Sequence, residues 1–183
     1  MLLWHLGATI ALTRYAFRDE RMDLRFLMLG AVLPDLIDTP LGLIFYEALQ
    51  SVRLFSHSLV LAGLLMTWIV LATRRGRPRK RWMPIAIGVL IHLFLDAMWA
   101  DPETLWWPVL GLEFSPAAAM TAGDLVTDTI SNLWVWLGEA AGLVYLVVLA
   151  RRSDLGAAEA RREFFSTGRV SAAIGISGPP SEP

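Results

Sequence analysis

The sequence has 183 residues, enough for one domain, and it contains no cysteine. Hydrophobic residues make up 55% of the chain and charged residues only 18%, against roughly 25% charged residues in an ordinary soluble domain. This composition excludes a wholly disordered chain and disfavours a soluble enzyme. The net charge of −1 excludes a uniformly basic nucleic-acid binder, and the lack of thiols excludes disulfides, thiolate metal sites and cysteine nucleophiles. We therefore expect an integral membrane protein, in which His and carboxylate side chains would hold any metal.

Five apolar segments are predicted to form helices. They are residues 2–17, 25–46, 54–73, 83–99 and 130–150. A helix needs about 20 apolar residues to cross a bilayer core, and the last three segments are close to that length. The first segment is short and Pro34 and Pro40 interrupt the second, so we expect these two helices to be short or broken. The predicted fold is an all-α, polytopic membrane helical bundle of about five membrane helices. A signal peptide is the alternative for residues 1–17, although neither a basic start nor a cleavage site is clear.

The basic residues predict an orientation for this bundle. Three clusters, at 14–25, 74–81 and 151–169, follow the first, third and fifth helix and contain every Lys and Arg except Arg53. If the helices cross in alternating directions, all three clusters lie on one side, which the positive-inside rule assigns to the cytoplasm. We therefore expect a multi-pass protein of the cytoplasmic (inner) membrane, with its N-terminus outside and its C-terminus in the cytoplasm.

The chain is expected to divide into a membrane domain and a tail. Residues 1–152 form the integral membrane helical domain. Residues 153–183 form a cytoplasmic tail, predicted to be disordered from about residue 166, where Ser, Gly and Pro are frequent. Residues 100–128 are the longest stretch expected to lack helix, and the predicted orientation places this acidic stretch outside.

Six ionisable residues fall within the apolar segments or at their ends. They are His5, Asp35, Asp38, His57, His92 and Asp96. A carboxylate in the middle of a bilayer costs about 2.5–3.5 kcal/mol even on lenient scales, so such residues need a cation, a paired network or a water-filled cavity. At a helical rise of about 1.5 Å per residue, the predicted orientation places all six in the outer half of the membrane. Their shared depth indicates one polar site.

The spacing of these residues favours a metal site. His92 and Asp96 are four residues apart and Asp35 and Asp38 are three apart, so each pair shares one helix face. Imidazole combined with carboxylate suits Zn, Mn or Fe, and we favour one or two divalent ions of Zn or Mn. The alternatives are a core histidine at His5, a simple hydrogen bond between His92 and Asp96, and a solvated loop around the two aspartates.

The motifs that contain these residues resemble those of a known family. His5 is followed by LPDLID (33–38), RLFSHS (53–58) and HLFLD (92–96). This order resembles the bacterial and archaeal family of membrane-bound metal-dependent hydrolases that includes the LexA-regulated inner-membrane protein YdjM, over about residues 1–110 of this chain. The family pattern has an early His, then G-x-x-x-P-D-x-D, R-x-x-T-H-S and H-x-x-L-D. Here one additional residue separates the two aspartates, and Ser replaces Thr before the second His.

A more distant likeness is to zinc-dependent phospholipase C and related nucleases, which share this order of ligands in a helical fold. The likeness implies that one metal is held by Asp35, His57, His92 and Asp96. It also implies that Asp96 bridges to a second metal held by His5. Those enzymes have a further metal with two His ligands and a Glu, for which no His remains here. Asp124 and Asp128 could partly replace that set, and the alternative is that they form a solvated acidic helix start.

Together these features predict a membrane-embedded metal-dependent hydrolase that acts on a phospholipid or other lipid phosphoester at the outer side of the membrane. A metal-activated water would attack phosphorus, and Asp38 is our candidate for the carboxylate that orients or deprotonates it. Arg53, the one basic residue expected outside, could clamp a phosphate or anchor its helix end to lipid headgroups. A membrane lipid is therefore the expected partner, and the sequence does not indicate an oligomeric state.

Two non-enzymatic alternatives remain open from the sequence. Intramembrane His and Asp residues also occur in ion and proton pathways, so a metal-binding or ion-coupled membrane protein is the main alternative. The clustering of all six residues in one half argues against it, because no polar path would lead to the cytoplasm. A metal that only holds helices together is the other alternative, and it would have closed coordination without water.

Overall fold

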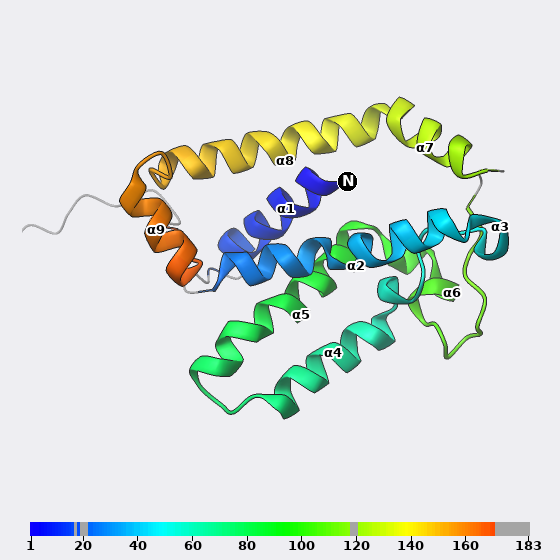
Figure 1. Ribbon diagram of the computed structural model, residues 1–183, viewed down its shortest axis with the longest axis horizontal. Coiled ribbons are helices and arrows are strands. Elements are labelled where there is room, and N and C mark those ends of the chain that lie inside the picture. The colour runs from blue at the N-terminus through cyan, green and yellow to red at the C-terminus, as the bar shows by residue number, and fades with distance from the viewer. Residues whose placement is uncertain (17, 19–21, 118–120, 171–183) are drawn as a thin grey trace, which may run out of the picture.

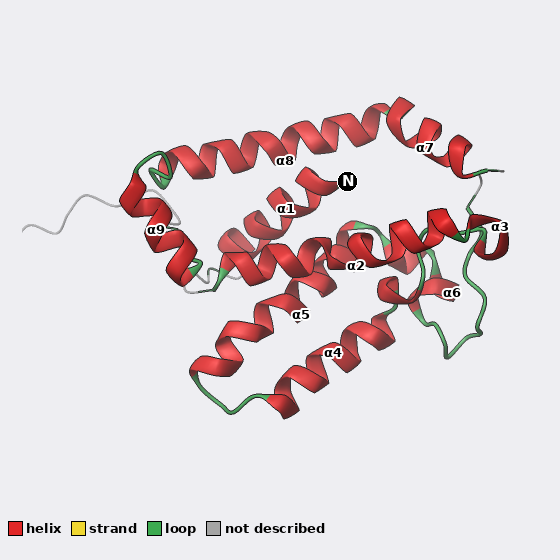
Figure 2. Cartoon of the chain, viewed as in Figure 1, coloured by secondary structure: helices red, strands yellow, loops and turns green. Residues whose placement is uncertain are grey.

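The computed structural model describes residues 1–16, 18, 22–117 and 121–170, and within these residues the secondary structure is entirely helical (Figures 1 and 2). The longer helices are α1 (Leu2–Ala11), α2 (Leu24–Ile44), α4 (Leu59–Ala72), α5 (Arg77–Leu95), α7 (Ala122–Ser131), α8 (Leu133–Arg152) and α9 (Ala158–Thr167). The short helices are the π-helix η1 (Leu12–Ala16), α3 (Tyr46–Leu49), η2 (Phe55–His57), η3 (Met98–Ala100) and α6 (Pro102–Leu105). The all-α prediction is confirmed for this part of the chain.

Each of the five predicted apolar segments overlaps one of the longer helices, namely α1, α2, α4, α5 and α8, although α5 begins at Arg77, before its predicted segment. Among the described residues, α2 and α8 are long and apolar enough to cross a membrane, and α4 is apolar but spans only 14 residues. The first 5 residues of α5, Arg77–Arg81, contain four of the basic residues that precede its apolar part. The number of membrane crossings therefore stays a prediction.

The second helix differs from its prediction. We expected residues 25–46 to be broken at the prolines, but α2 continues for 21 residues with Pro34 and Pro40 inside it. Each proline removes one backbone hydrogen bond, and packing against a neighbour can compensate for that loss. Pro34 is buried, and its carbonyl accepts a hydrogen bond from the Ser56 hydroxyl at 3.0 Å. The first helix is short, as expected, and η1 extends it to Ala16.

The packing of α2 on α5 brings most of the candidate site together. A Cβ atom added to Gly30 of α2 would lie 2.1 Å from the carbonyl oxygen of Ile85 on α5. One added to Gly88 of α5 would lie 2.4 Å from the carbonyl oxygen of Leu27 on α2. Because neither position has space for a side chain, the two backbones come into direct contact. This contact fixes the faces of α2 and α5 that carry the predicted ligands.

The connections between helices that carry most of the basic residues lie at one end of the molecule. In Figure 1 the end of η1, the connection from α4 to α5, and the end of α8 with α9 all lie on the left. The short helices α3 and α6 and the start of α7 lie on the right. The basic connections thus lie at one end of the molecule, and the orientation of that end in a membrane stays a prediction. Residues 100–128, expected to lack helix, contain α6 and most of α7.

The first part of the predicted tail contains α9 and contacts the start of α2. The carbonyl oxygen of Gly168, which follows α9, accepts a hydrogen bond from Leu24 N–H at 2.8 Å. The Arg25 guanidinium donates to the backbone carbonyl of Ser166 at 3.4 Å and to that of Phe165. The beginning of α2 is thus joined to the end of α9. The remainder of the predicted disordered tail, residues 171–183, lies outside the described residues.

Candidate metal centre

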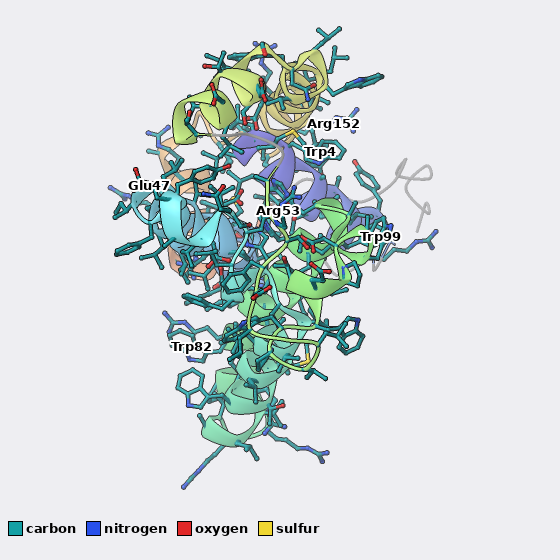
Figure 3. All side chains as sticks on the ribbon, turned by 90° about the vertical axis from the view of Figure 1, so that its right-hand side faces the viewer. Trp4, Glu47, Arg53, Trp82, Trp99 and Arg152 are labelled. Carbon is teal, nitrogen blue, oxygen red and sulfur yellow. The ribbon has the colours of Figure 1, made fainter. Side chains whose placement is uncertain are left out.

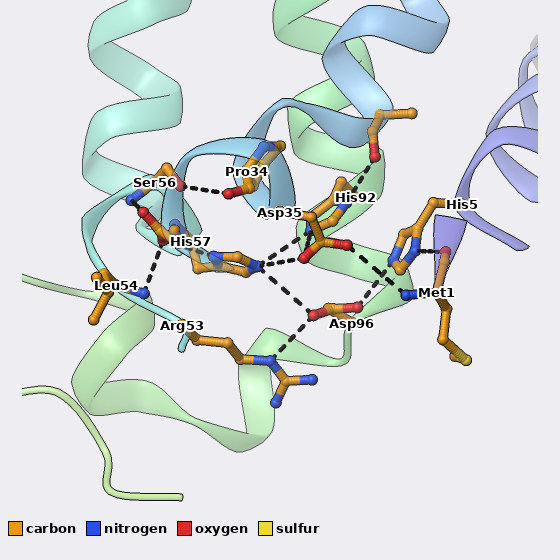
Figure 4. Close-up of polar contacts among 12 residues, drawn as sticks. Met1, His5, Pro34, Asp35, Arg53, Leu54, Ser56, His57, His92 and Asp96 are labelled. Atoms are coloured by element: carbon orange, nitrogen blue, oxygen red, sulfur yellow. Dashed lines mark hydrogen bonds and ion pairs between the residues drawn. The ribbon is translucent and has the colours of Figure 1, made fainter. Parts of the chain in front are cut away.

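Four different elements supply the six predicted site residues. The structure brings all six into one cluster, in which Asp38 contacts His57 and the other five contact one another (Figure 4). His5 lies on α1, Asp35 and Asp38 on α2, His57 on η2, and His92 at the end of α5 with Asp96 as its C-cap. The three histidines and Asp38 are at most 2% exposed. The Asp96 side chain is 11% exposed and the Asp35 side chain 35%. The carboxylates of Asp35 and Asp96 therefore form the accessible side of a buried group.

Asp38 lies behind His57 and holds it in place. Its carboxylate accepts hydrogen bonds from three backbone N–H groups, those of Leu54 (2.8 Å), Ser56 (3.0 Å) and His57 (3.2 Å). The same carboxylate also accepts from His57 Nδ1 at 2.8 Å. With four donors and no exposure, Asp38 has no free face for a water. This position differs from the water-orienting one expected from the sequence, and it matches a carboxylate that orients a ligand histidine.

All three histidine rings are oriented in the same way. His92 Nδ1 donates to the backbone carbonyl of Ala31 at 2.7 Å, and His5 Nδ1 donates to the carbonyl of Met1 at 2.5 Å. Oxygen acceptors at Nδ1 require a proton there, so in a neutral ring Nε2 has a lone pair. All three Nε2 atoms point towards Asp35 or Asp96. This is the pattern of metal-binding histidines, whose second nitrogen is held by an outer partner.

The distances among four of these residues match the size of a metal ion. His57 Nε2 lies 3.3 Å from His92 Nε2 and 3.5 Å from Asp35 Oδ1. His92 Nε2 lies 3.7 Å from Asp35 Oδ1, and His57 Nε2 lies 3.8 Å from Asp96 Oδ2. In a tetrahedral zinc site with metal–ligand bonds of about 2.1 Å, the ligand atoms are about 3.4 Å apart. One atom from each of these residues lies within 4.8 Å of the others.

The protonation pattern of the His57 and His92 rings also supports a metal ion between their Nε2 atoms. With both Nδ1 atoms donating, neutral His57 and His92 rings present lone pairs to each other across 3.3 Å. Such an arrangement is repulsive by itself, and a cation between the nitrogens would make it favourable. The two nearby carboxylates would balance the charge of that cation. The residues present therefore fit a divalent metal bound by two imidazoles and two carboxylates.

His5 lies beside this four-residue set. Its Nε2 atom is 2.9 Å from Asp96 Oδ1, and its ring stacks on that of His92 with centroids 4.3 Å apart. The ring is 2% exposed, and Nε2 makes no well-oriented hydrogen bond with the described residues. Asp96 thus presents one oxygen to the four-residue set and the other to His5. This geometry is what a carboxylate between two cation positions requires.

Arg53 lies at the accessible edge of the cluster. Its Nε donates to Asp96 Oδ2 at 3.1 Å, and its side chain is 47% exposed. In Figure 3, which views the molecule from the right-hand side of Figure 1, Arg53 lies near the middle of this end. Its two terminal nitrogens make no hydrogen bond with the described residues, and Figure 4 shows them directed away from Asp96.

Several contributors could not be found from the sequence. The carbonyl groups of Met1 and Ala31 carry no side-chain signal of a metal site, because they act through backbone position. Asp124 and Asp128, considered for a further metal, lie on α7 and do not join the described four-residue set. Asp124 instead forms a capping box with Thr121 at the exposed start of that helix.

Comparison with known proteins decides the family. The profile described as "YdjM inner membrane protein" matches residues 3–156, which is most of the chain. The chain belongs to the YdjM inner membrane protein family. The match continues beyond residues 1–110, the region of the resemblance. It includes all six site residues, because every one of them lies between His5 and Asp96. Neither the comparison with curated proteins nor that with solved structures found a match.

Membership in the YdjM family agrees with the apolar helices α2 and α8 and supports a membrane location. The family description names the membrane and no reaction. The chemistry of this YdjM-family chain therefore has to be argued from the buried His and Asp cluster.

Proposed function

We propose that this YdjM-family protein is a multi-pass inner membrane hydrolase that uses a divalent metal, Zn or Mn, to cleave a phospholipid or other lipid phosphoester at the outer side of the membrane. The proposal rests on one observation. Three buried histidines each donate Nδ1 to an oxygen and direct Nε2 towards Asp35 or Asp96. Buried imidazoles fixed in this manner are typical of metal ligands.

The residues divide into ligands and supporting groups. In this proposal Asp35, His57, His92 and Asp96 hold one ion, and His5 with Asp96 holds a second. When bound, such ions polarise phosphoryl oxygens and lower the pKa of water. Asp35 is the most exposed carboxylate of the cluster, so it replaces Asp38 as the group that accepts a proton from the attacking water. The water oxygen forms a bond to phosphorus, the phosphorus–oxygen bond to the alcohol breaks, and the leaving alkoxide takes up the proton that Asp35 accepted.

Arg53 is assigned to the phosphate. Its Nε is held by Asp96 while its terminal nitrogens remain available for two parallel hydrogen bonds to phosphate oxygens. Arg53→Lys removes this planar pair of donors but keeps the charge. We expect Arg53→Lys to raise the KM for a lipid phosphoester by about tenfold, as loss of one charged hydrogen bond of about 1.4 kcal/mol would. An unchanged KM would instead favour the headgroup-anchoring role for this residue.

The test is elemental analysis followed by a lipid assay. Purified protein in detergent should contain one or two equivalents of transition metal and should release phosphorylated headgroup or diacylglycerol from mixed phospholipid micelles, followed by mass spectrometry. His92→Ala and Asp96→Ala should lose both the metal and the activity. Glu47→Gln, an exposed carboxylate on α3, is the matched control and should keep both. Wild-type protein that stays folded, contains no metal and cannot be reloaded would contradict the proposal.

One observation favours the ion-coupled alternative. Thr9 and Thr13 follow His5 at four-residue intervals, so the three share one face of the first helix. Both hydroxyls are fully buried and have no hydrogen-bond partner among the described residues. Elsewhere, Thr127 and Thr129 donate to the backbone carbonyl four residues earlier. A row of polar side chains that leads away from the site is expected of an ion path. Metal-dependent proton flux into proteoliposomes, without lipid hydrolysis, would support the ion-coupled function instead of the hydrolase.

A further inference from the structure

Glu139 is an acidic residue within the apolar helix α8, and its carboxylate contacts another helix. Its Oε2 atom accepts a hydrogen bond from the backbone N–H of Leu3 on α1, at 2.8 Å. An ionisable group in a membrane-spanning helix is costly and generally has a function. None of the metal-centre residues lies on α8, and Glu139 contacts the element that carries His5, α1.

The hydrogen bond from Leu3 N–H to Glu139 gives the start of α1 a cap that its own residues do not supply. The first turn of a helix has N–H groups without partners inside the helix, and a negative charge there is stabilising. Met1, the N-cap residue, makes no side-chain capping hydrogen bond. Glu139 therefore acts as a cap supplied by a different helix. In Figure 1, α1 lies directly beneath α8, which agrees with this contact.

A second contact fixes the same turn of α1. A Cβ atom added to Gly142 of α8 would lie 2.1 Å from the carbonyl oxygen of Leu3. Gly142 and Glu139 are three residues apart, so they share one face of α8. This face thus contacts both the N–H and the C=O of Leu3. The position of the first turn of α1 is consequently set by α8.

The same turn carries His5 into the metal centre. His5 follows Leu3 by two residues, its Nδ1 donates to Met1 O, and its Nε2 lies 2.9 Å from Asp96 Oδ1. A displacement of this turn would move the ring and the carbonyl that orients it together. Because a metal ligand must lie within a few tenths of an ångström of its ion, His5 depends on how the turn is held.

We propose that Glu139 is a positioning residue for His5, which it holds against Asp96 by capping the first turn of α1 from α8. This inference rests on the metal site of the proposed function. It assigns α8 a role in that site even though α8 contributes no ligand, and it gives a reason for a carboxylate in the middle of an apolar helix.

The test compares Glu139→Leu, Glu139→Gln and His5→Ala in full-length protein in detergent, loaded with Zn²⁺ or Co²⁺ alone. Glu139→Leu removes the acceptor, whereas the amide oxygen of Glu139→Gln can accept the same N–H. We expect Glu139→Leu to bind metal 10–100-fold more weakly, the range typical of outer-shell partners. Its Co²⁺ absorption spectrum should shift towards that of His5→Ala. Glu139→Gln should restore the wild-type spectrum and affinity.

The double variant separates positioning from general stability. If Glu139 acts through His5, then His5→Ala/Glu139→Leu should bind metal as weakly as His5→Ala alone. A purely structural role would lower the Tm of Glu139→Leu but leave its Co²⁺ spectrum and affinity unchanged, and this result would overturn the inference. If Glu139→Leu does not fold, Glu139→Asp keeps the charge on a shorter side chain and must show the same spectral shift.

The outcomes also distinguish this inference from the proposed function. Wild-type protein that binds neither Zn²⁺ nor Co²⁺ would overturn both. Wild-type protein that binds metal, with a Glu139→Leu spectrum identical to its own, would overturn only the role of Glu139. Metal binding that depends on Glu139, without lipid hydrolysis, would support the positioning role and contradict the hydrolase.

Discussion

His57 and His92 direct their Nε2 atoms at each other across 3.3 Å, while their Nδ1 atoms donate to Asp38 and to the Ala31 carbonyl. A cation between them should therefore stabilise the folded protein. At a free metal concentration about 100 times its Kd, this stabilisation is about 2.7 kcal/mol. A chelator should then lower the Tm by roughly 5–10 °C for a chain of this size. The measurement is thermal unfolding in detergent with and without chelator, and His92→Ala should show no chelator effect.

Asp38 is expected to influence metal affinity more than the chemical step. Asp38→Asn keeps the size of the side chain but weakens the hold on His57 Nδ1, so the Kd for Zn²⁺ should rise about 10–100-fold. Competition with a chromogenic chelator measures this change, and turnover should return at saturating metal. Unchanged affinity combined with lost turnover would give Asp38 the water-orienting role that the sequence favours.

The contact of α2 with α5 predicts opposite effects for two glycine substitutions. A Cβ atom at Gly30 would lie 2.1 Å from the Ile85 carbonyl oxygen, so Gly30→Ala must separate the helices. We expect a loss of stability of about 1–3 kcal/mol and reduced metal content, because Asp35 and His92 lie on the separated helices. Gly63→Ala on α4 is the matched control.

A Cβ atom at Gly63 would meet nothing within 4 Å. Alanine is favoured over glycine inside a helix by about 0.5–1 kcal/mol, so Gly63→Ala should not destabilise the protein and should keep its metal. Unfolding midpoints and elemental analysis of the two variants test the pair. Equal effects of both substitutions would contradict the proposed importance of the α2–α5 contact.

Asp23 gives a prediction for the pH dependence of stability. Burial pushes the pKa of Asp23 upwards, but hydrogen bonds from Arg25 and its positive charge outweigh burial and hold that pKa below its ordinary value. A lowered pKa stabilises the fold above the unfolded-state value, and this contribution disappears as the pH falls through the folded-state value. Asp23→Asn should therefore cost about 1 kcal/mol at pH 7. The difference from wild type should disappear at about pH 2–3, below the unfolded-state pKa of about 3.9. In an Arg25→Gln variant, the free energy of unfolding should lose the same dependence on pH.

The sequence was sufficient to predict the approximate positions of α1, α2, α4, α5 and α8, but not those of α7 and α9. It also indicated which ionisable side chains meet. Apolar runs of membrane length occur where α2, α4, α5 and α8 form, since helix length and hydropathy are local properties. His92 and Asp96, whose polar side chains cost free energy inside a membrane, lie on one helix face because their spacing matches the helical period. The residue types alone also indicated that a metal, if present, would have nitrogen and oxygen ligands.

Only the tertiary structure decided how these residues are used. Asp38 lies behind His57 because three backbone N–H groups of the following loop surround its carboxylate. α2 continues through its prolines in a fold where Gly30 allows α5 to approach. Glu139 joins α8 to the turn that carries His5. These relationships depend on backbone groups from distant parts of the chain, whose meeting no local pattern of side chains encodes.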